Sequence, residues 1–514
     1  MPRTSGCTRV RGGGETANPD DTCSPGPGCG TGWNRWRTTL TGGMREGGRV
    51  VWALDVTNPP DFNSASGEQP TGPAYPAYLW EFPCEASACD SWRPYMGQTW
   101  SQPVITRVRA TVDGPVTGPS YDRWVAIFGA GYDPQGDPNL AHQTDSSLVD
   151  DPADPLVYDA GSDAALTSVA GRAVFMVDMA SGQVLAAKRF DVNGSAGDSS
   201  DGEPGMAFAF AADPAVFDID RDGYADVVYI GDLGGNVWKW VIDEPAEDHI
   251  NGISGDDHQD RWSFFKLFTA ESCTTCSPKH YKSFFFPPTG ALVGRNLWLT
   301  LGSGERNDLD FGEAGGPDVP LDPQEKNRFY VFKDPDPFDN ERPAIVPYND
   351  TGTVTPAQFV DITSITGTNP NTCLPTGSVG FYLEGAEGEK FVTDTSIFFG
   401  VVLTGSYVPA AAGASVCDSV GEGFIYGFNL LCGEGAFPPT SGDPSDPAER
   451  RLGIGIGLPN APRVSVGPVG GGGGGGGGGC ADMVMVMTSD GQAITTCPGG
   501  RPDSGVHTRS WRDF

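Results

Sequence analysis

Short β-type runs recur along most of the chain in a similar order, and this repetition is what most constrains the fold. One module is "DPAVFDIDRDGYADVVYIGDLGGNVWKWVID", and another is "FVTDTSIFFGVVLTGSYVP" followed by "EGFIYGFNLL". Each has a strand that often follows Pro, a second strand that ends in Gly, and a third with an aromatic residue or Asp near a turn. Because one small sheet cannot bury its apolar faces alone, such repeats predict an all-β β-propeller with about seven blades. A ring of six or eight blades and a β-sandwich array are the alternatives.

Composition predicts three regions. Residues 1–32 are rich in Gly, Pro, Thr and Cys without apolar periodicity, so they are predicted to be a flexible lead-in. The propeller domain is expected over residues 33–500, followed by a C-terminal tail over 501–514. Within the domain, the glycine tract 470–479 is predicted to be a floppy loop between two strands.

One turn of the repeat, "DIDRDGYAD", concentrates negative charge around a single glycine. Counted from Asp218, it matches the first nine positions of the calcium-binding loop, in which alternate side chains converge and Gly at position six permits the sharp turn. The flanking runs are strand-like, and Tyr229 stands where a helical calcium loop carries a bidentate Glu. We therefore predict a calcium loop between two β-strands. Its predicted ligands are Asp218, Asp220, Asp222, Asp226 and the main-chain carbonyl of Tyr224. A solvated acidic turn without an ion is the alternative.

The oxygen-only donor set favours calcium over transition metals, and magnesium prefers a compact octahedron that retains water. Without a cation, the clustered carboxylates would repel one another by about a kcal/mol per pair. We expect the ion to lock the turn between the two strands.

Charge and cysteine usage bound the possible partners and compartment. The 514 residues carry a formal net charge of −33, which argues against binding to the phosphate backbone of nucleic acids. The twelve cysteines include close pairs, which favour disulfides in an oxidising compartment. These pairs are Cys84 with Cys89, Cys273 with Cys276, Cys417 with Cys432, and Cys480 with Cys497. Half of a zinc site is the alternative for Cys273 and Cys276.

The start of the sequence conflicts with the oxidising compartment that the cysteines favour. The first residues lack the apolar segment of a secretory signal, and no run of about twenty apolar residues could span a membrane. We hypothesise that the chain is the C-terminal part of a longer exported protein, or that its start is mis-assigned.

The motifs resemble the C-terminal domain of the PilC/PilY family of type IV pilus tip proteins. The resemblance is carried by "TTLTGGMREGGRVVWALDVTNP", "WSQPVITRV", "DIDRDGYADVVYIGDLGGNVWKW", "NRFYVFKD" and "KFVTDTSIFFGVVLTGSYVP", in that order, over roughly residues 33–497. It implies an extracellular or outer-membrane-associated adhesin and pilus biogenesis factor. The resemblance also implies that the calcium loop regulates pilus extension against retraction and supports surface attachment and twitching motility. The implied partners are pilins or minor pilins and a host or abiotic surface. Nothing here resembles the von Willebrand A-type domain of many members, and no Arg-Gly-Asp tripeptide is present.

Two other functions remain open. Quinone-dependent dehydrogenases are also calcium-containing propellers rich in Trp, but their catalytic calcium should be held by scattered residues rather than by one loop. Integrin-α or FG-GAP propellers carry the loop in several blades, whereas this chain shows one clear copy. The five histidines lie in polar, loop-like surroundings, and no G-x-S-x-G, H-E-x-x-H or P-loop motif occurs. We predict that the protein is not an enzyme.

Overall fold

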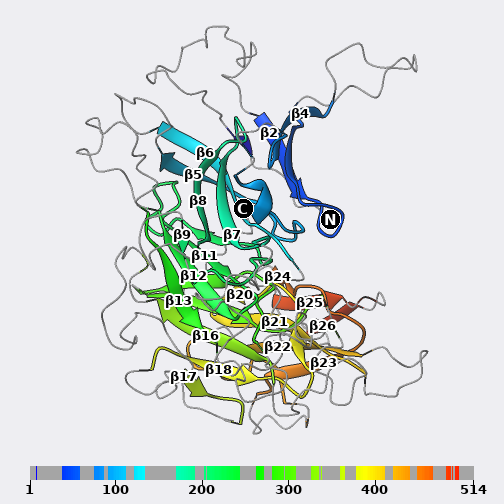
Figure 1. Cartoon of the computed structure of the whole chain (residues 1–514). Helices are drawn as coiled ribbons and strands as arrows, with labels where there is room; N and C mark the ends of the chain where they lie inside the picture. The colour runs from blue at the N-terminus through cyan, green and yellow to red at the C-terminus, as the bar shows by residue number, and fades with distance from the viewer. Residues whose placement is uncertain are drawn as a thin grey trace, which may run out of the picture. The chain divides into compact units, whose positions relative to one another are not determined.

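In a computed structural model, the regular secondary structure of the residues described below is almost entirely β-strand (Figure 1). The structure describes residues 7–8, 37–57, 75–85, 89, 91–110, 121–133, 169–191, 202–203, 205–242, 262–270, 281–294, 296–307, 309, 326–334, 337, 359–364, 378–410, 421–439, 441, 448–466, 482–487, 489 and 493–496. Helical structure in these ranges is limited to the 3₁₀ turn η2 (Arg93–Tyr95) and to Cys89, which also has 3₁₀ conformation. Within the part of the chain so described, no helix is long and apolar enough to cross a membrane.

The chain forms two compact units, which are treated separately. Unit 1 comprises Met1–Asp137, Tyr158–Ile230 and Lys239–Phe265, and unit 2 comprises Pro138–Val157, Gly231–Trp238 and Lys266–Phe514.

The N-terminal half contains three sheets of consecutive strands. The first has the order β1–β2–β3–β4: β1 (Cys7–Thr8), β2 (Arg37–Gly43), β3 (Val51–Asp55) and β4 (Ala77–Phe82). The second has the order β5–β6–β7–β8–β9: β5 (Val104–Ala110), β6 (Tyr121–Gly129), β7 (Ala173–Asp178), β8 (Val184–Phe190) and β9 (Gly202–Glu203). The third has the order β10–β11–β12–β13: β10 (Ala215–Phe217), β11 (Val227–Gly231), β12 (Asn236–Val241) and β13 (Phe264–Thr269).

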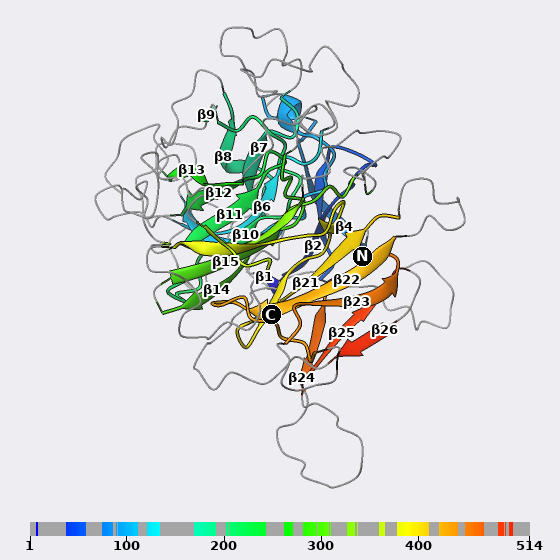
Figure 2. The same cartoon turned by 90° about the horizontal axis from the view of Figure 1, so that it is seen from below.

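The C-terminal half contains three more sheets. Strands β21, β22 and β23 of one of them are seen side by side in Figure 2. The fourth has the order β14–β15–β16–β18–β17: β14 (Thr289–Val293), β15 (Asn296–Gly302), β16 (Arg328–Asp334), β17 (Phe359–Asp361) and β18 (Gly380–Glu384). The fifth has the order β19–β21–β22–β23, with β20 also paired to β21: β19 (Lys390–Phe391), β20 (Ser396–Phe398), β21 (Val401–Val408), β22 (Glu422–Asn429) and β23 (Arg451–Ile456). The sixth is β24 (Arg463–Val466), β25 (Asp482–Met487) and β26 (Ala493–Thr496).

Neighbouring strands pair antiparallel except β8 with β9 and β17 with β18. The predicted all-β fold of repeated small sheets, the organisation of a β-propeller, is confirmed. The described residues contain six sheets, so the number of about seven blades stays a prediction. Cys7–Thr8, inside the predicted lead-in, pair with Thr38 and Arg37. The rest of the lead-in, the glycine tract 470–479 and the tail 501–514 lie outside the described residues.

Several strands are buried along their whole length. Every residue of β7, β11 and β12 is buried, which requires cover on both faces of the sheet. Strands of this kind carry continuous apolar runs instead of the alternation of a half-exposed strand. In unit 1, Phe175 packs against Phe82 with ring centroids 4.9 Å apart, inside one core cluster. In unit 2, Phe329 and Phe428 pack 5.6 Å apart in another.

The glycine at the end of the second strand of a module has a steric cause. A Cβ added to Gly129 at the end of β6 would lie 2.4 Å from the carbonyl oxygen of Phe210. A Cβ on Gly302 at the end of β15 would lie 2.3 Å from the Cβ of Phe391. Both approaches are closer than any side chain allows, so the repeat requires glycine where the next segment of chain crosses the strand end.

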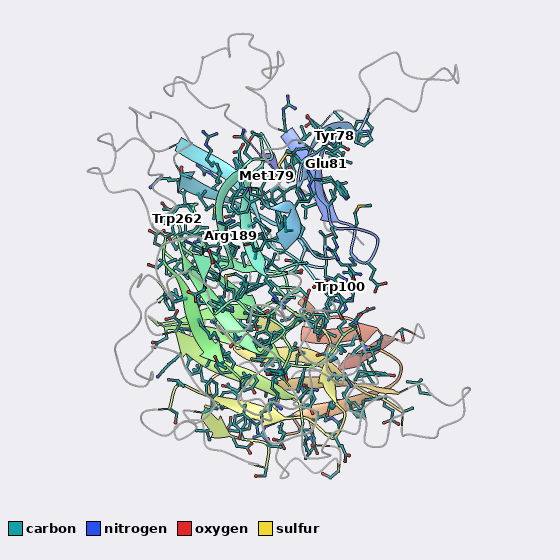
Figure 3. The ribbon with its side chains drawn as sticks, in the orientation of Figure 1. Tyr78, Glu81, Trp100, Met179, Arg189 and Trp262 are labelled. Atoms are coloured by element: carbon teal, nitrogen blue, oxygen red, sulfur yellow. A yellow bond between two sulfur atoms is a disulfide. The ribbon has the colours of Figure 1, made fainter. Side chains whose placement is uncertain are left out.

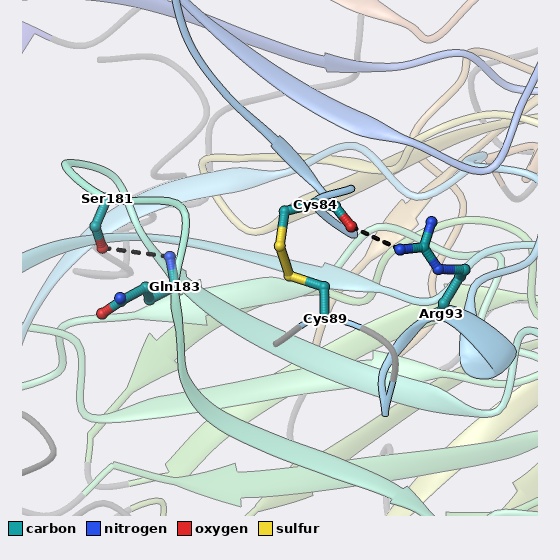
Figure 4. Close-up of a disulfide and its surroundings, with 5 residues drawn as sticks. All are labelled: Cys84, Cys89, Arg93, Ser181 and Gln183. Carbon is teal, nitrogen blue, oxygen red and sulfur yellow. Dashed lines mark hydrogen bonds between the residues drawn. A yellow bond between two sulfur atoms is a disulfide. The ribbon is translucent and has the colours of Figure 1, made fainter. Parts of the chain in front are cut away.

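Cross-links between segments stabilise unit 1. The indole Nε1 of Trp80 on β4 donates to the carbonyl of Met179, which is labelled in Figure 3, at 3.0 Å. Cys84 and Cys89 form a disulfide after β4, and Arg93 donates to the Cys84 carbonyl at 2.9 Å (Figure 4). The predicted Cys84–Cys89 pair is therefore present. Cys432 is also disulfide-bonded. The other predicted pairs, Cys273 with Cys276 and Cys480 with Cys497, and also Cys417, lie outside the described residues.

A second repeated device is an Asp or Asn that ends a strand and accepts hydrogen bonds from the turn after it. Asp55 accepts from Thr57 N at 2.9 Å, and Asn429 accepts from Leu431 N at 2.9 Å. Such side chains satisfy backbone donors that no strand partner reaches. This explains why the third strand of a module so often carries Asp near its turn.

Asp232 is the most buried example, with none of its surface exposed. Its Oδ1 accepts from Gly234 N at 2.9 Å and from Asn236 N at 3.0 Å. Its Oδ2 accepts from the indole Nε1 of Trp238 at 2.8 Å. Both oxygens of Asp232 thus accept from N–H donors. If an asparagine replaced it, its NH₂ group would face another N–H group in either orientation of the amide.

Asp232→Asn should lower the free energy of unfolding by roughly 2 kcal/mol, because it leaves buried donors without an acceptor. The measurement is urea unfolding followed by tryptophan fluorescence. The matched control is Asp361→Asn, because exposed Asp361 accepts one comparable turn bond, from Thr363 N at 2.9 Å. An equal, small effect of the two variants would show that the buried turn does not stabilise the sheet.

Candidate metal centre in the β10–β11 connection

The aspartate-rich segment forms a hairpin loop between two paired strands. Phe217 at the end of β10 lies opposite Val227 at the start of β11. The backbone N–H of Asp226 donates to the Phe217 carbonyl at 2.8 Å and closes the loop at its base. This is the predicted placement of the loop, between two β-strands and without helices.

Two residues let the backbone of the loop turn sharply. Gly223 has a φ of 91° and Arg221 a φ of 69°. The left-handed region is costly for most residues and open to glycine, so position six of the motif needs Gly for a conformational reason.

The carboxylates are oriented by bonds within the loop itself. Asp218 Oδ2 accepts from Gly223 N at 3.0 Å. Asp220 Oδ1 accepts from Asp222 N at 3.0 Å, and Asp222 Oδ1 accepts from Tyr224 N at 2.8 Å. These local bonds hold three side chains in defined directions before any ligand is present.

The oriented side chains converge. One carboxylate oxygen from each of Asp218, Asp220 and Asp222 lies within 4.8 Å of the other two. Asp218 is half-buried and the other two are exposed. Three like charges at this separation repel one another, so the arrangement favours a positive ligand between them.

Asp218 carries the clearest sign that a ligand belongs in the loop. Its Oδ1 is buried from solvent and has no hydrogen-bond partner. An unsatisfied carboxylate oxygen is costly, because it has lost water and gained no donor. Burial also raises the pKa of Asp218, and the neighbouring Asp222 and Asp220 raise it further. A cation at this oxygen would replace the missing interaction.

Asp226, the fourth predicted ligand, is directed towards the backbone. Its Oδ2 accepts from Ile219 N, and from Asp220 N at 3.3 Å. Burial raises its pKa to about 6, against the effect of these two backbone donors. The structure therefore brings three of the four predicted aspartates together and uses Asp226 to close the loop.

The ring of Tyr224 packs under two arginines that the sequence analysis did not assign to the site. The guanidinium carbons of Arg107 and Arg109 on β5 lie 4.3 Å and 4.1 Å from the ring centroid. Their alternate spacing in "VITRVRA" places them on one face of β5, but nothing in the sequence links that strand to the loop. The main-chain carbonyl of Tyr224 stays a predicted ligand.

The donor set fits a hard divalent cation. Only oxygen atoms converge in the loop, the glycine at position six permits the turn, and one buried oxygen lacks a partner. Calcium accepts carboxylate, carbonyl and water oxygens in flexible geometry, so it suits this loop better than magnesium does.

A separate pocket of about 470 Å³ lies in unit 2. Glutamates and arginines dominate its lining, and Arg451 forms an ion pair of 3.2 Å with buried Glu389. The hydroxyl of Tyr426 donates to the same carboxylate at 3.2 Å. Two lining residues thus contact buried Glu389, which is not itself among the residues that line the pocket, and the lining includes no Ser, Cys or His.

Comparison with known proteins gives both sequence and structural matches. No protein-family model matches the chain. The chain is 29% identical over 208 residues to the type IV pilus biogenesis factor PilY1 homolog of Xylella fastidiosa, covering 40% of this chain and 10% of that protein. It is 25% identical over 207 residues to the type IV pilus biogenesis factor PilY1 of Pseudomonas aeruginosa, covering 40% of this chain and 11% of that protein. The matched region is thus about a tenth of the length of these relatives.

Among solved structures, the crystal structure of the Pseudomonas aeruginosa PilY1 C-terminal domain is similar to this chain with a TM-score of 0.54. The match has 18% sequence identity and covers 91% of this chain and 82% of that chain. At this identity the match establishes a shared fold.

The raised pKa of Asp226 predicts a pH dependence of the metal-free protein. An unfolded Asp has a pKa near 3.9, whereas that of folded Asp226 is about 6, so the folded state binds more protons between these values. The free energy of unfolding should therefore fall as the pH rises from about 4 to about 6. In thermal melts with a chelator, Asp226→Asn should remove the decrease in stability between about pH 4 and about pH 6. An unchanged slope in the variant would contradict the assignment.

Proposed function

Since the sequence and fold comparisons support a PilY1-family protein of type IV pili, we propose that this chain is a calcium-binding, pilus tip-associated protein that acts in pilus biogenesis. In this role it influences pilus extension against retraction, surface adhesion and twitching motility. It works outside the cell, at the pilus tip or the outer-membrane surface, and contacts pilins or minor pilins and a host or abiotic surface. The named relatives are biogenesis factors, and we propose no catalytic role for this chain.

The buried Oδ1 of Asp218 carries the calcium part of the proposal. It is a carboxylate oxygen without a partner beside two further converging carboxylates. Asp218, Asp220 and Asp222 would hold the ion, and the carbonyl of Tyr224, Asp226 and water would complete its shell. Calcium supplies two positive charges there and no reaction chemistry.

The residues of the loop then act on the hairpin. When the cation neutralises the carboxylates, they no longer repel one another. The loop then holds β10 and β11 in register without this repulsion. Binding to the folded state alone stabilises it, by about 2.7 kcal/mol at a calcium concentration one hundred times Kd. Calcium in the medium thereby sets how rigid this part of the domain is.

The integrin-α or FG-GAP alternative predicts several ions per chain. Among the described residues, the loop is the one place where three His, Cys, Asp or Glu side chains converge closely enough to hold a metal. This supports a single site of the pilus-protein kind, with about one calcium per chain.

Asp222→Ala tests the site in the purified chain. With calcium at one hundred times the wild-type Kd, the wild type should melt roughly 5 °C higher than with chelator. The variant should lose most of this rise, because one of three converging carboxylates is gone and affinity falls roughly tenfold or more. Asp361→Ala, which removes an exposed aspartate of unit 2, should keep the full response. Equal calcium responses of Asp222→Ala and the wild type would refute the ligand assignment.

The cellular role needs a piliated bacterium that carries the gene. Deletion should reduce surface pili, and complementation with Asp222→Ala should restore less twitching motility than complementation with Asp361→Ala. The readouts are sheared surface pilin and the width of the twitching zone. Normal piliation and twitching after deletion would refute the pilus function and leave the calcium site as a separate question.

A further inference from the structure

Two arginines of β5 connect the aspartate loop to the neighbouring sheet β5–β9. Arg107 and Arg109 are two residues apart on one strand, so their side chains leave the same face. Both guanidinium groups lie over the ring of Tyr224, at 4.3 Å and 4.1 Å from its centroid. Each arginine also makes a further contact with the loop.

Arg107 contacts the loop through Tyr224 and through its own main chain. Its Nη2 donates to the hydroxyl of Tyr224 at 2.7 Å, and its main-chain carbonyl accepts from Ala225 N at 2.8 Å. These contacts do not compete with a cation for oxygen atoms of the aspartates. Arg107 can therefore hold the loop on β5 whether or not an ion is bound.

Arg109 does compete with a cation. Its Nη2 lies 3.7 Å from Asp222 Oδ2, while Asp222 Oδ1 accepts from Tyr224 N. Asp222 is also one of the three carboxylates that converge in the loop. Both side chains of the pair are about one-third exposed, at 32% and 31%, so water and salt weaken this ion pair and it can be displaced.

The local charge favours displacement by a divalent cation. The four aspartates of the loop outnumber the nearby Arg107, Arg109 and Arg221, so a small negative charge remains without metal. Without Arg109, the four aspartates with Arg107 and Arg221 carry a charge of about −2, and a dication neutralises it, so the filled site no longer attracts the guanidinium of Arg109. The positive charge of Arg109 offsets the repulsion between carboxylates in the metal-free loop. The same charge repels an incoming cation and so opposes metal binding.

We propose that Arg109 is a built-in counter-cation: it neutralises Asp222 in the metal-free protein, is displaced by calcium, and thereby sets the calcium concentration at which the loop fills. This inference rests on the proposed calcium site and concerns its regulation. Arg107 keeps the loop on β5, so filling of the loop changes the side-chain contacts at an edge strand of the neighbouring sheet.

Calcium titration of the metal-free full chain by isothermal calorimetry tests the proposal. Arg109→Gln and Arg109→Met remove the charge, and both should tighten the calcium Kd about threefold to tenfold. Arg109→Lys keeps the charge and should stay within about twofold of wild type. Arg45→Gln makes the same change in net charge at an exposed position between β2 and β3, and it should leave Kd unchanged. The gain of the neutral variants should shrink in 0.5 M NaCl, because exposed charges are then screened.

The direction of the change decides the outcome. If Arg109 only packs against Tyr224, its loss should loosen the loop and weaken calcium binding. Equal or weaker binding by both neutral variants, with folding verified by circular dichroism, would overturn the counter-cation and leave the calcium site intact. Failure of the wild type to bind millimolar calcium would overturn both the site and the inference.

Discussion

The convergence of Asp218, Asp220 and Asp222 is the interaction on which the account depends. One carboxylate oxygen from each lies within 4.8 Å of the other two, and the buried Oδ1 of Asp218 has no hydrogen-bond partner. Folding alone does not favour such an arrangement, because it concentrates like charge and leaves an acceptor unsatisfied. The loop nevertheless orients these side chains with its own backbone N–H groups. A cation between these side chains would remove both the repulsion and the unsatisfied acceptor, and this best explains why the loop orients them.

The surrounding strands hold the loop on two sides. β11 is buried along its length, so the strand that leaves the loop is held by the core. On the other side, the ring of Tyr224 and the backbone of Ala225 connect the loop to β5 through Arg107. The loop is thus attached both to a buried strand of its own sheet and to the edge strand β5 of the neighbouring sheet. Under the proposed calcium binding, this arrangement gives the ion a route to alter the domain without any catalytic chemistry.

The sequence predicted those features that arise from local spacing. Strand-end glycines such as Gly302 mark close crossings of the chain, and Asp232 marks a turn with many donors, so the repeat was recognisable. The alternating aspartates and Gly223 predicted the converging cluster, because their spacing within one short loop determines it. The inward direction of Asp226 and the contact of Arg109 with Asp222 were not predictable. Both depend on tertiary packing, and the second joins segments more than one hundred residues apart.

A crystal structure of the chain grown with calcium, with an anomalous difference map, would test the central claim most directly. The account predicts one strong peak in the loop, at about 2.3–2.6 Å from Asp218 Oδ1 and from oxygens of Asp220 and Asp222. It further predicts that the guanidinium of Arg109 has moved away from Asp222 in that crystal. A map without a peak, with the three aspartates turned into solvent, would contradict the account.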